Sequence, residues 1–314
     1  MILTLVTVVL PVFLVIGAGF VAAKARLFPA GAVDGLMAFA QSFAVPCLLF
    51  RAISELDLGA TFDPWLLVAF YLPALICFAL GAIGVRVLFR RRPGEAVAIG
   101  FGALFSNSLL LGIPIMERAY GADALGPNFA IIAVHAPFCY LVGIAVMEVV
   151  RADGRGPLGT ARAVGRAMFR NALMIGLALG FAVNLSGLDI GDPVRVAVGM
   201  MADAALPAAL FGLGGVLTRY AIRASLGEAG LIAALSLLLH PALAYALAAW
   251  VFALPEAFVR SAVVTAAMAP GVNAYVFASL YSRGQAQAAS VVLLATAASV
   301  LTVSAWLTLL GGVR

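Results

Sequence analysis

The chain has 314 residues, of which 64% are hydrophobic and only 11% are charged, and its formal net charge is +5. With a mean hydropathy of +1.12, it has too few polar side chains to cover the surface of a soluble domain of this length. The composition therefore excludes a soluble globular protein and predicts an all-α membrane protein.

Ten apolar stretches are long enough to cross a hydrocarbon core of about 30 Å, which takes about 20 helical residues. Backbone polar groups in lipid must be satisfied within the segment, so we expect all ten to be helices. In chain order, the expected spans are Leu5–Ala23, Val33–Ile53, Pro64–Phe89, Glu95–Met116, Pro127–Val149, Ala167–Gly187, Val194–Thr218, Gly230–Phe252, Ala257–Leu280 and Gln285–Leu310.

The second half of the chain repeats the first at a constant shift of 161 residues. The segment Ala44–Phe50 corresponds to Ala205–Phe211 with the proline in register, and Gly19 and Glu95 recur as Gly180 and Glu256. Five spans per half make the second copy enter the membrane from the opposite side, and such inverted repeats are typical of secondary transporters. We therefore expect a first five-helix repeat over 1–150, a cytoplasmic connector over 151–166 and a second, inverted repeat over 167–314.

Basic residues alternate between the two sides of the expected spans, with 14 of the 19 on one side and 5 on the other. The positive-inside rule places the richer side, with the longest loop, in the cytoplasm. This predicts a multi-pass protein of the plasma membrane (the bacterial inner membrane) with both termini outside, and it explains the net charge without a nucleic-acid partner. The five basic residues of the outer side are Arg51, Arg118, Arg195, Arg260 and Arg314.

Two expected spans contain residues that disfavour a continuous helix. Ser106-Asn107-Ser108 precedes Gly112 and Pro114 in the fourth span, and Met268-Ala269-Pro270-Gly271-Val272-Asn273 lies in the ninth. Proline removes a backbone donor, whereas glycine tolerates the dihedral angles that a break requires. Because the two segments correspond at the same shift, we expect matched helix breaks that form a substrate site. The candidate substrate-binding residues are Asn107, Ser108, Gly112, Pro114, Pro270, Gly271 and Asn273.

The alternative interpretation is that these prolines only bend transmembrane helices, as prolines often do. It applies with more force to isolated prolines, among which Pro46 and Pro207 correspond at the shift of 161 and are expected to be helix kinks. The matched pair of breaks, each with an adjacent glycine and asparagine, favours a functional role.

The segment Asn107–Pro114, followed by Tyr120-Gly121, resembles the fourth-helix motif of the auxin efflux carrier family, and Pro270–Ala278, followed by Tyr281, is similar to its ninth-helix crossover. That family includes plant auxin exporters and bacterial carriers of malate or malonate. The resemblance covers the whole chain and implies the fold of the bile-acid/sodium symporter superfamily, with a scaffold domain, a transport domain holding crossed broken helices 4 and 9, and a homodimer. Two positions, Pro270 and Ala274, differ from the plant pattern, so the resemblance does not specify auxin.

Polar residues within the spans are candidates for ion coupling. Asp203 is the acidic residue placed well inside a span, and a carboxylate there usually faces a cavity or binds an ion. Gln41 lies beside the position that corresponds to Asp203, and Asn128 lies two turns before His135 on one helix face. The alternatives are that Asp203 pairs with a neighbouring helix and that His135 is a packing residue.

Three cysteines lie inside spans without a CxxC pair, which favours buried apolar residues over a disulfide or a metal site. An intramembrane enzyme would need a nucleophile with a base, or a metal set, and no such spacing is present. A channel would need a continuous polar stripe, whereas the polar residues cluster at two points. We therefore expect a carrier that moves a small organic anion by alternating access among membrane lipids, without a cofactor other than Na⁺ or H⁺ as a coupling ion. A symporter of another small organic solute is the alternative.

Overall fold

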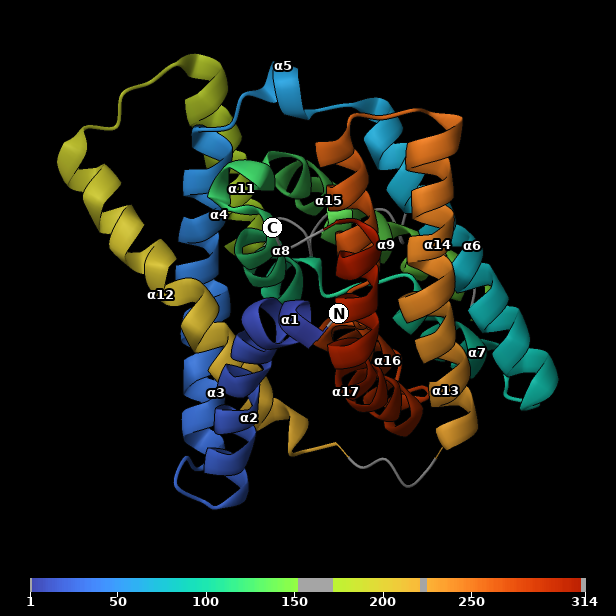
Figure 1. Ribbon diagram of the computed structural model, residues 1–314. Coiled ribbons are helices and arrows are strands. Elements are labelled where there is room, and N and C mark those ends of the chain that lie inside the picture. The colour runs from blue at the N-terminus through green and yellow to red at the C-terminus, as the bar shows by residue number, and fades with distance from the viewer. Residues whose placement is uncertain (1, 152–171, 221–224, 312–314) are drawn as a thin grey trace. The chain divides into compact units, whose positions relative to one another are not determined.

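The computed structural model describes residues 2–151, 172–220 and 225–311, and these ranges fold into helices with no β-strand among them (Figure 1). Within the described ranges, seven helices are long and apolar enough to cross a membrane. They coincide with the first, second, third, fifth, seventh, eighth and tenth expected spans: Val6–Lys24, Ala30–Ser54, Pro64–Leu88, Ala122–Val150, Asp192–Leu217, Leu226–Val251 and Gln285–Leu309. The sixth span is the shorter helix α11 (Ala172–Ser186), and the connector beyond Arg151 lies outside the described residues.

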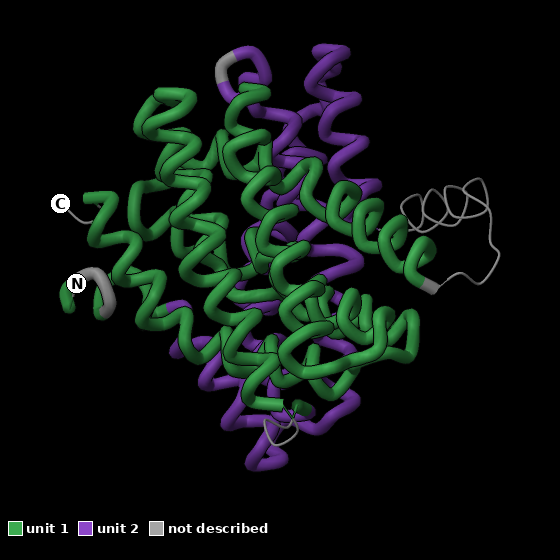
Figure 2. Tube along the Cα trace, turned by 90° about the vertical axis from the view of Figure 1, so that its right-hand side faces the viewer, with its two compact units in different colours: residues 1–11, 62–160, 220–314 green, residues 12–61, 161–219 purple. Residues whose placement is uncertain are grey.

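The chain divides into two compact units, and each unit contains segments from both halves of the sequence (Figure 2). Unit 1 comprises Met1–Pro11, Phe62–Thr160 and Tyr220–Arg314. Unit 2 comprises Val12–Thr61 and Ala161–Arg219.

Unit 2 consists of four expected spans whose backbones approach closely at glycines. Its elements are α2 (Leu10–Lys24), α3 (Ala30–Phe39), η2 (Ala40–Ala44), α4 (Val45–Ser54), α5 (Leu58–Thr61), α11 and α12 (Asp192–Leu217). A methyl group on Gly19 of α2 would lie 1.9 Å from the carbonyl oxygen of Phe211 in α12, and one on Gly180 of α11 would lie 3.0 Å from that of Phe50 in α4. Gly180 follows Gly19 by 161 residues and Phe50 precedes Phe211 by 161 residues, so the two contacts are equivalent under the repeat.

Gly176 extends the close approach of α11 to α4, because a methyl group there would lie 2.4 Å from the carbonyl oxygen of Pro46. The small-xxx-small spacing of Gly176 and Gly180 is typical of tightly packed membrane helices. Backbone proximity therefore requires glycine at Gly19, Gly176 and Gly180.

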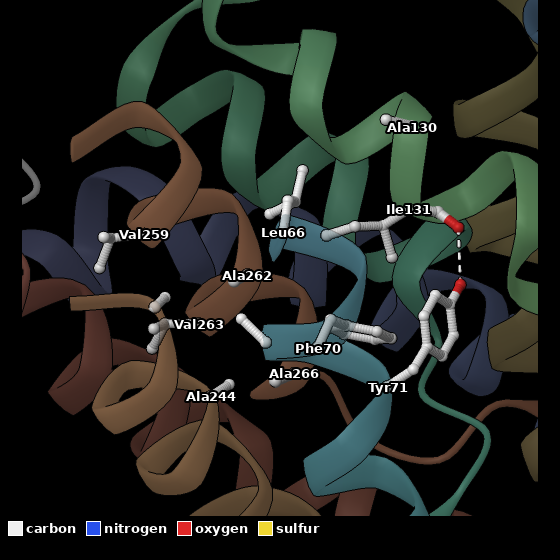
Figure 3. Close-up of a cluster of buried hydrophobic side chains, with 12 residues drawn as sticks. Leu66, Phe70, Tyr71, Ala130, Ile131, Ala244, Val259, Ala262, Val263 and Ala266 are labelled. Atoms are coloured by element: carbon white, nitrogen blue, oxygen red, sulfur yellow. Dashed lines mark hydrogen bonds between the residues drawn. The ribbon is translucent and has the colours of Figure 1, made fainter. Parts of the chain in front are cut away.

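Unit 1 is built around a core of small and aromatic side chains (Figure 3). Leu66 and Phe70 pack against Ala262 and Val263, and the hydroxyl of Tyr71 donates a hydrogen bond of 2.8 Å to the carbonyl oxygen of Ile131. Alanines at the helix contacts allow close packing, and the hydrogen bond satisfies a polar group that lipid could not. The elements of this core are α6 (Pro64–Leu88), α9 (Gly126–Arg151), α14 (His240–Tyr245), η8 (Ala246–Val251) and α15 (Glu256–Ala266).

The eighth span begins earlier than expected and contains the buried partner of an ion pair. We expected this span from Gly230, but α13 (Leu226–Ala234) begins earlier and includes Glu228, which is 5% exposed. Two donors of Arg91 reach one oxygen of Glu228, with Nη2 at 2.7 Å and Nε at 2.8 Å. A buried carboxylate requires such a partner, and sequence spacing alone could not identify one 137 residues away.

In the described part of the chain, four prolines are each the second residue after a π-helical turn. The π-helices η1 (Leu5–Val9), η2, η4 (Ser108–Gly112) and η7 (Leu235–Leu239) each lead into an α-helix whose second residue is proline, namely Pro11, Pro46, Pro114 and Pro241. The proline ring clashes with the carbonyl four residues earlier, and a widened turn relieves that clash. Pro46 thus marks a local change of helix type, whereas Pro207 lies inside α12, which remains α-helical through it.

Candidate functional site

The fourth and ninth expected spans are both interrupted, at the positions that the sequence predicts. In the fourth, α7 (Pro93–Gly100) and η3 (Phe101–Ala103) end before an unwound segment, and η4 and α8 (Ile113–Tyr120) follow it. In the ninth, α15 ends at Ala266 and α16 (Val272–Leu280) begins after the second unwound segment. Both breaks belong to unit 1.

The two breaks pair with each other through their backbones. The N–H of Asn107 donates to the carbonyl of Ala269 at 2.8 Å, and the N–H of Gly271 donates to that of Phe105 at 3.2 Å. Between them, Ser106 and Pro270 form an isolated antiparallel bridge. Unwound backbone in a membrane interior must find partners within the protein. Each break therefore supplies hydrogen-bond partners that the other lacks.

The glycines at the breaks do not use the dihedral freedom that we expected of them. Gly271 has φ −75° and ψ 168°, and Gly112 has φ −65° and ψ −48°, which any residue can adopt. The expectation that these positions need glycine for a strained backbone is wrong. A methyl group on Gly271 would instead lie 3.6 Å from Cα and Cβ of Asn107, in ordinary contact, so glycine leaves space beside that side chain.

Gly121 is a position where the backbone does require glycine. It follows α8 with φ +89°, in a region that other residues rarely adopt, and its N–H donates to the carbonyl of Glu117 at 2.8 Å. The Tyr120-Gly121 pair of the sequence motif therefore ends the second half of the fourth span.

Two asparagine side chains border the paired breaks. Asn107 is 8% exposed, and its side-chain amide makes no hydrogen bond to another described residue. Asn273, in the first turn of α16, accepts a hydrogen bond of 3.1 Å from the hydroxyl of Tyr140 at its Oδ1. With that oxygen engaged, the Nδ2 group of Asn273 remains as a donor. Tyr140 was not among the expected site residues, because a single tyrosine in an apolar span carries no distinctive sequence signal.

An aromatic group flanks Tyr140. The rings of Phe101 and Phe277, one from each interrupted span, stack with centroids 4.0 Å apart, and Tyr140 lies 5.8 Å from Phe101 and 5.7 Å from Phe105. Aromatic side chains combine a large apolar surface with restricted rotamers. They fix the position of the hydroxyl that holds Asn273.

His135 contacts the first break directly. Its Nε2 lies 3.1 Å from the carbonyl oxygen of Ser106, and its ring packs edge-on against Phe105 with centroids 4.7 Å apart. Because a carbonyl can only accept, Nε2 carries the proton in this contact. The hydroxyl of Ser106 is buried and has no hydrogen-bond partner among the described residues.

Asn128 lies in a fully buried polar cluster between α9 and α15. Its Nδ2 donates to the hydroxyl of Thr265 and its Oδ1 accepts from the hydroxyl of Ser261, both at 2.8 Å. The three residues are 0% exposed. The cluster joins α9 to the helix that ends at the second break, and no sequence pattern distinguishes Ser261 or Thr265 from other polar residues of the spans.

Of the remaining candidates in unit 1, Ser108 and Gly112 are the first and last residues of η4, and Pro114 is the second residue of α8; all three are buried. The other candidates belong to unit 2. Asp203 in α12 pairs with Nη1 of Arg51 in α4 at 2.9 Å, which is the alternative that we weighed for it. Gln41 in η2 is exposed. The role of these residues in ion coupling stays a prediction.

The chain matches a family of membrane transport proteins along its length. The family model described as "Membrane transport protein" matches residues 4–155 and 157–307. A protein of Rhizobium meliloti (strain 1021) named "Putative malonate transporter" is 26% identical over 306 residues, which cover 96% of this chain and 94% of that protein. An "Uncharacterized transporter" of Methanothermobacter thermautotrophicus is 26% identical over 207 residues, 64% of each chain. Because the family model spans both halves, the chain belongs to the auxin efflux carrier family of membrane transport proteins.

Proposed function

We propose that the protein carries a small organic carboxylate across the plasma membrane, and that the substrate binds at the paired breaks of unit 1. The observation that carries this proposal is the pairing of Asn107 with Ala269 and of Gly271 with Phe105, which brings two half-helix N-termini together. One helical run begins at Ser108 and the other at Val272.

The hydrogen-bonding groups at the breaks favour an anion. The first N–H groups of a helix have no partner within it, and the N-terminus carries a partial positive charge. The carbonyl oxygens of Phe105, Ser106 and Ala269 already accept hydrogen bonds, from Gly271, His135 and Asn107. The donors that remain include the Nδ2 groups of Asn107 and Asn273, beside the first N–H groups of the two helical runs. Such a set matches a carboxylate better than a metal cation.

The class of substrate follows from the site together with the relatives. The Rhizobium meliloti protein is named for malonate, a dicarboxylate. Two half-helix N-termini and two asparagine amides supply enough donors for two carboxylate groups. We therefore infer a small dicarboxylate such as malonate as the first candidate.

We propose ten membrane crossings in two inverted repeats, which adds three shorter or interrupted spans to the seven long helices. Leu3 and Gly311 line the same pocket of unit 1, so the two ends of the described chain lie at the same end of that unit. An odd number of crossings would leave them on opposite faces. The seven long helices, the shorter α11 and the two interrupted spans together make ten, and the equivalent contacts of Gly19 and Gly180 support the repeat.

In the proposed alternating-access mechanism, unit 1 is the transport domain, since it contains both breaks, and unit 2 is the scaffold. The substrate site opens alternately to the two faces of the membrane. The membrane potential favours exit of an anion by about 2.3 kcal/mol per charge per 100 mV, so efflux needs no coupling ion whereas uptake needs one. Coupling to Na⁺ or H⁺ is the alternative form of the mechanism.

Purified protein reconstituted into liposomes tests the proposal. Liposomes loaded with unlabelled malonate should accumulate external radiolabelled malonate by exchange, and mono- and dicarboxylates in excess should compete according to their affinity. A thermal-shift series with the same acids, with and without Na⁺, reports binding independently of transport. If no carboxylate exchanges and none stabilises the protein, the proposal is contradicted.

A further inference from the structure

A pocket of about 760 Å³ lies in unit 1 at the end of α8 and the start of α15, which are the ends of these helices remote from the breaks. Its lining includes Arg118 and Tyr120 at the end of α8, and Glu256 and Arg260 in the first turns of α15. Twelve residues of helix separate Tyr120 from the first break, which corresponds to about 18 Å at 1.5 Å per residue. The pocket is therefore distinct from the site at the breaks.

The donors in this pocket exceed the acceptors. Nη2 of Arg118 donates to the backbone carbonyl of Thr7 at 2.7 Å, and Nη2 of Arg260 pairs with Oε1 of Glu256. A guanidinium carries five N–H donors, so most of those on the two arginines are left over. Two cationic side chains against one carboxylate also leave this group of residues with a net positive charge.

Two buried polar atoms at the pocket have no partner among the described residues, namely Nε of Arg260 and the hydroxyl of Tyr120. The guanidinium of Arg260 lies over the ring of Tyr120, 4.7 Å from its centroid, so the two groups are held together. Burial raises the pKa of Tyr120 to about 12; the charge of Arg260 lowers this pKa and that of Glu256 raises it, both by less than burial does, so the hydroxyl remains a donor at neutral pH. Unpaired buried donors are costly, and an oxyanion would satisfy them.

We propose that this pocket, the outer site, is a second binding site for the carboxylate. It holds the carboxylate before entry into the site at the paired breaks, the central site, or after release from it. The proposal rests on the proposed function for the identity of the anion. Arginine forks bind carboxylates through two parallel hydrogen bonds, and the volume lies within the usual range for small-molecule sites. The phosphate of an anionic lipid has the same chemistry, and the experiment separates the two sources.

Isothermal titration of the detergent-solubilised protein with malonate should show two sites per chain. Arg118→Gln combined with Arg260→Gln should weaken the outer site at least tenfold and leave the central site unchanged, whereas Asn107→Ala should weaken only the central site. Tyr120→Phe, which removes one hydroxyl, should weaken the outer site by a smaller factor. Arg195→Gln, at an exposed ion pair of unit 2, is the matched control.

Glu256→Gln should raise the affinity of the outer site for malonate, and misfolding cannot produce such a gain. Removing the competing carboxylate frees Arg260, so malonate should bind the outer site several-fold more tightly. One site per chain in a protein that exchanges malonate, or unchanged outer affinity in Glu256→Gln and in the arginine variants, would overturn this inference but not the proposed function. Affinity only for phosphatidylglycerol in nanodiscs would also overturn it. No carboxylate binding at all would contradict both.

Discussion

Replacing Gly19 with alanine should destabilise the protein through unit 2, and the size of the effect follows from the packing. The added methyl would lie 1.9 Å from the carbonyl oxygen of Phe211, so α2 and α12 would have to separate by about an ångström. Overpacking of this kind costs about 1–3 kcal/mol. Alanine regains about 0.5–1 kcal/mol through its higher helix propensity. We therefore expect a net loss of about 1 kcal/mol, and at most about 2.5 kcal/mol, in the free energy of unfolding.

Two matched variants separate packing from propensity. Gly17→Ala, on the same helix, meets nothing within 4 Å and should be neutral or slightly stabilising. Gly180→Ala, at the equivalent position of the repeat, meets Cβ of Ile53 at 2.9 Å and should fall between the two.

Thermal unfolding in detergent, followed with a thiol-reactive dye, suits this comparison because Cys77 and Cys139 are buried and Cys47 is partly buried. The expected order of melting temperatures is Gly17→Ala highest, then Gly180→Ala, then Gly19→Ala. Equal melting temperatures for Gly17→Ala and Gly19→Ala would refute the close approach of α2 and α12.

Three further predictions concern the breaks and the ion pairs. Gly271→Ala should fold normally, since its methyl makes only ordinary contacts, but should weaken malonate binding several-fold by occupying space beside Asn107; normal affinity would show that the substrate does not use that space. Arg91→Gln should lower the free energy of unfolding by about 1–3 kcal/mol, and more than Glu228→Gln, because it leaves the more buried partner charged and alone; the reverse order in thermal unfolding would contradict the burial of Glu228. Asp203→Asn should change the pH or Na⁺ dependence of transport if Asp203 couples an ion, and identical profiles would leave it only a partner of Arg51.

The helix breaks could be predicted because their causes are local. Pro270, Gly271 and the Asn107-Ser108 pair each disfavour helix within a few residues, and the repeat marks the two segments as equivalent. The reason given for the glycines was nevertheless wrong, since neither Gly112 nor Gly271 has a positive φ. A pattern of residue types locates a break but does not specify its dihedral angles.

The partners of the buried polar groups could not be predicted, because they depend on packing between distant segments. Tyr140 meets Asn273 across 133 residues, and Glu228 meets Arg91 across 137. Asp203 illustrates the same limit, since its position in an apolar span suggested an ion site whereas its neighbour in the structure is an arginine. The π-turns before Pro46 and Pro114 were also missed, because hydropathy does not distinguish a widened turn from an α-helical one.

The central claim is that the paired breaks bind the transported anion through donor groups. A negative charge introduced in place of either asparagine tests this claim most directly. Asn107→Ala and Asn273→Ala each remove hydrogen bonds to a charged group and should weaken malonate binding about 10- to 100-fold, because such bonds are worth about 1.5–3 kcal/mol. Asn107→Asp and Asn273→Asp keep the shape but place a carboxylate beside the substrate.

The measurement is the affinity for malonate of each aspartate variant compared with its alanine counterpart, in protein whose thermal unfolding matches that of the unmodified chain. The account predicts a loss at least tenfold greater for aspartate than for alanine at both positions, since like charges brought together in a binding site cost several kcal/mol. Equal affinities for the aspartate and alanine variants would contradict the claim that an anion binds at the paired breaks.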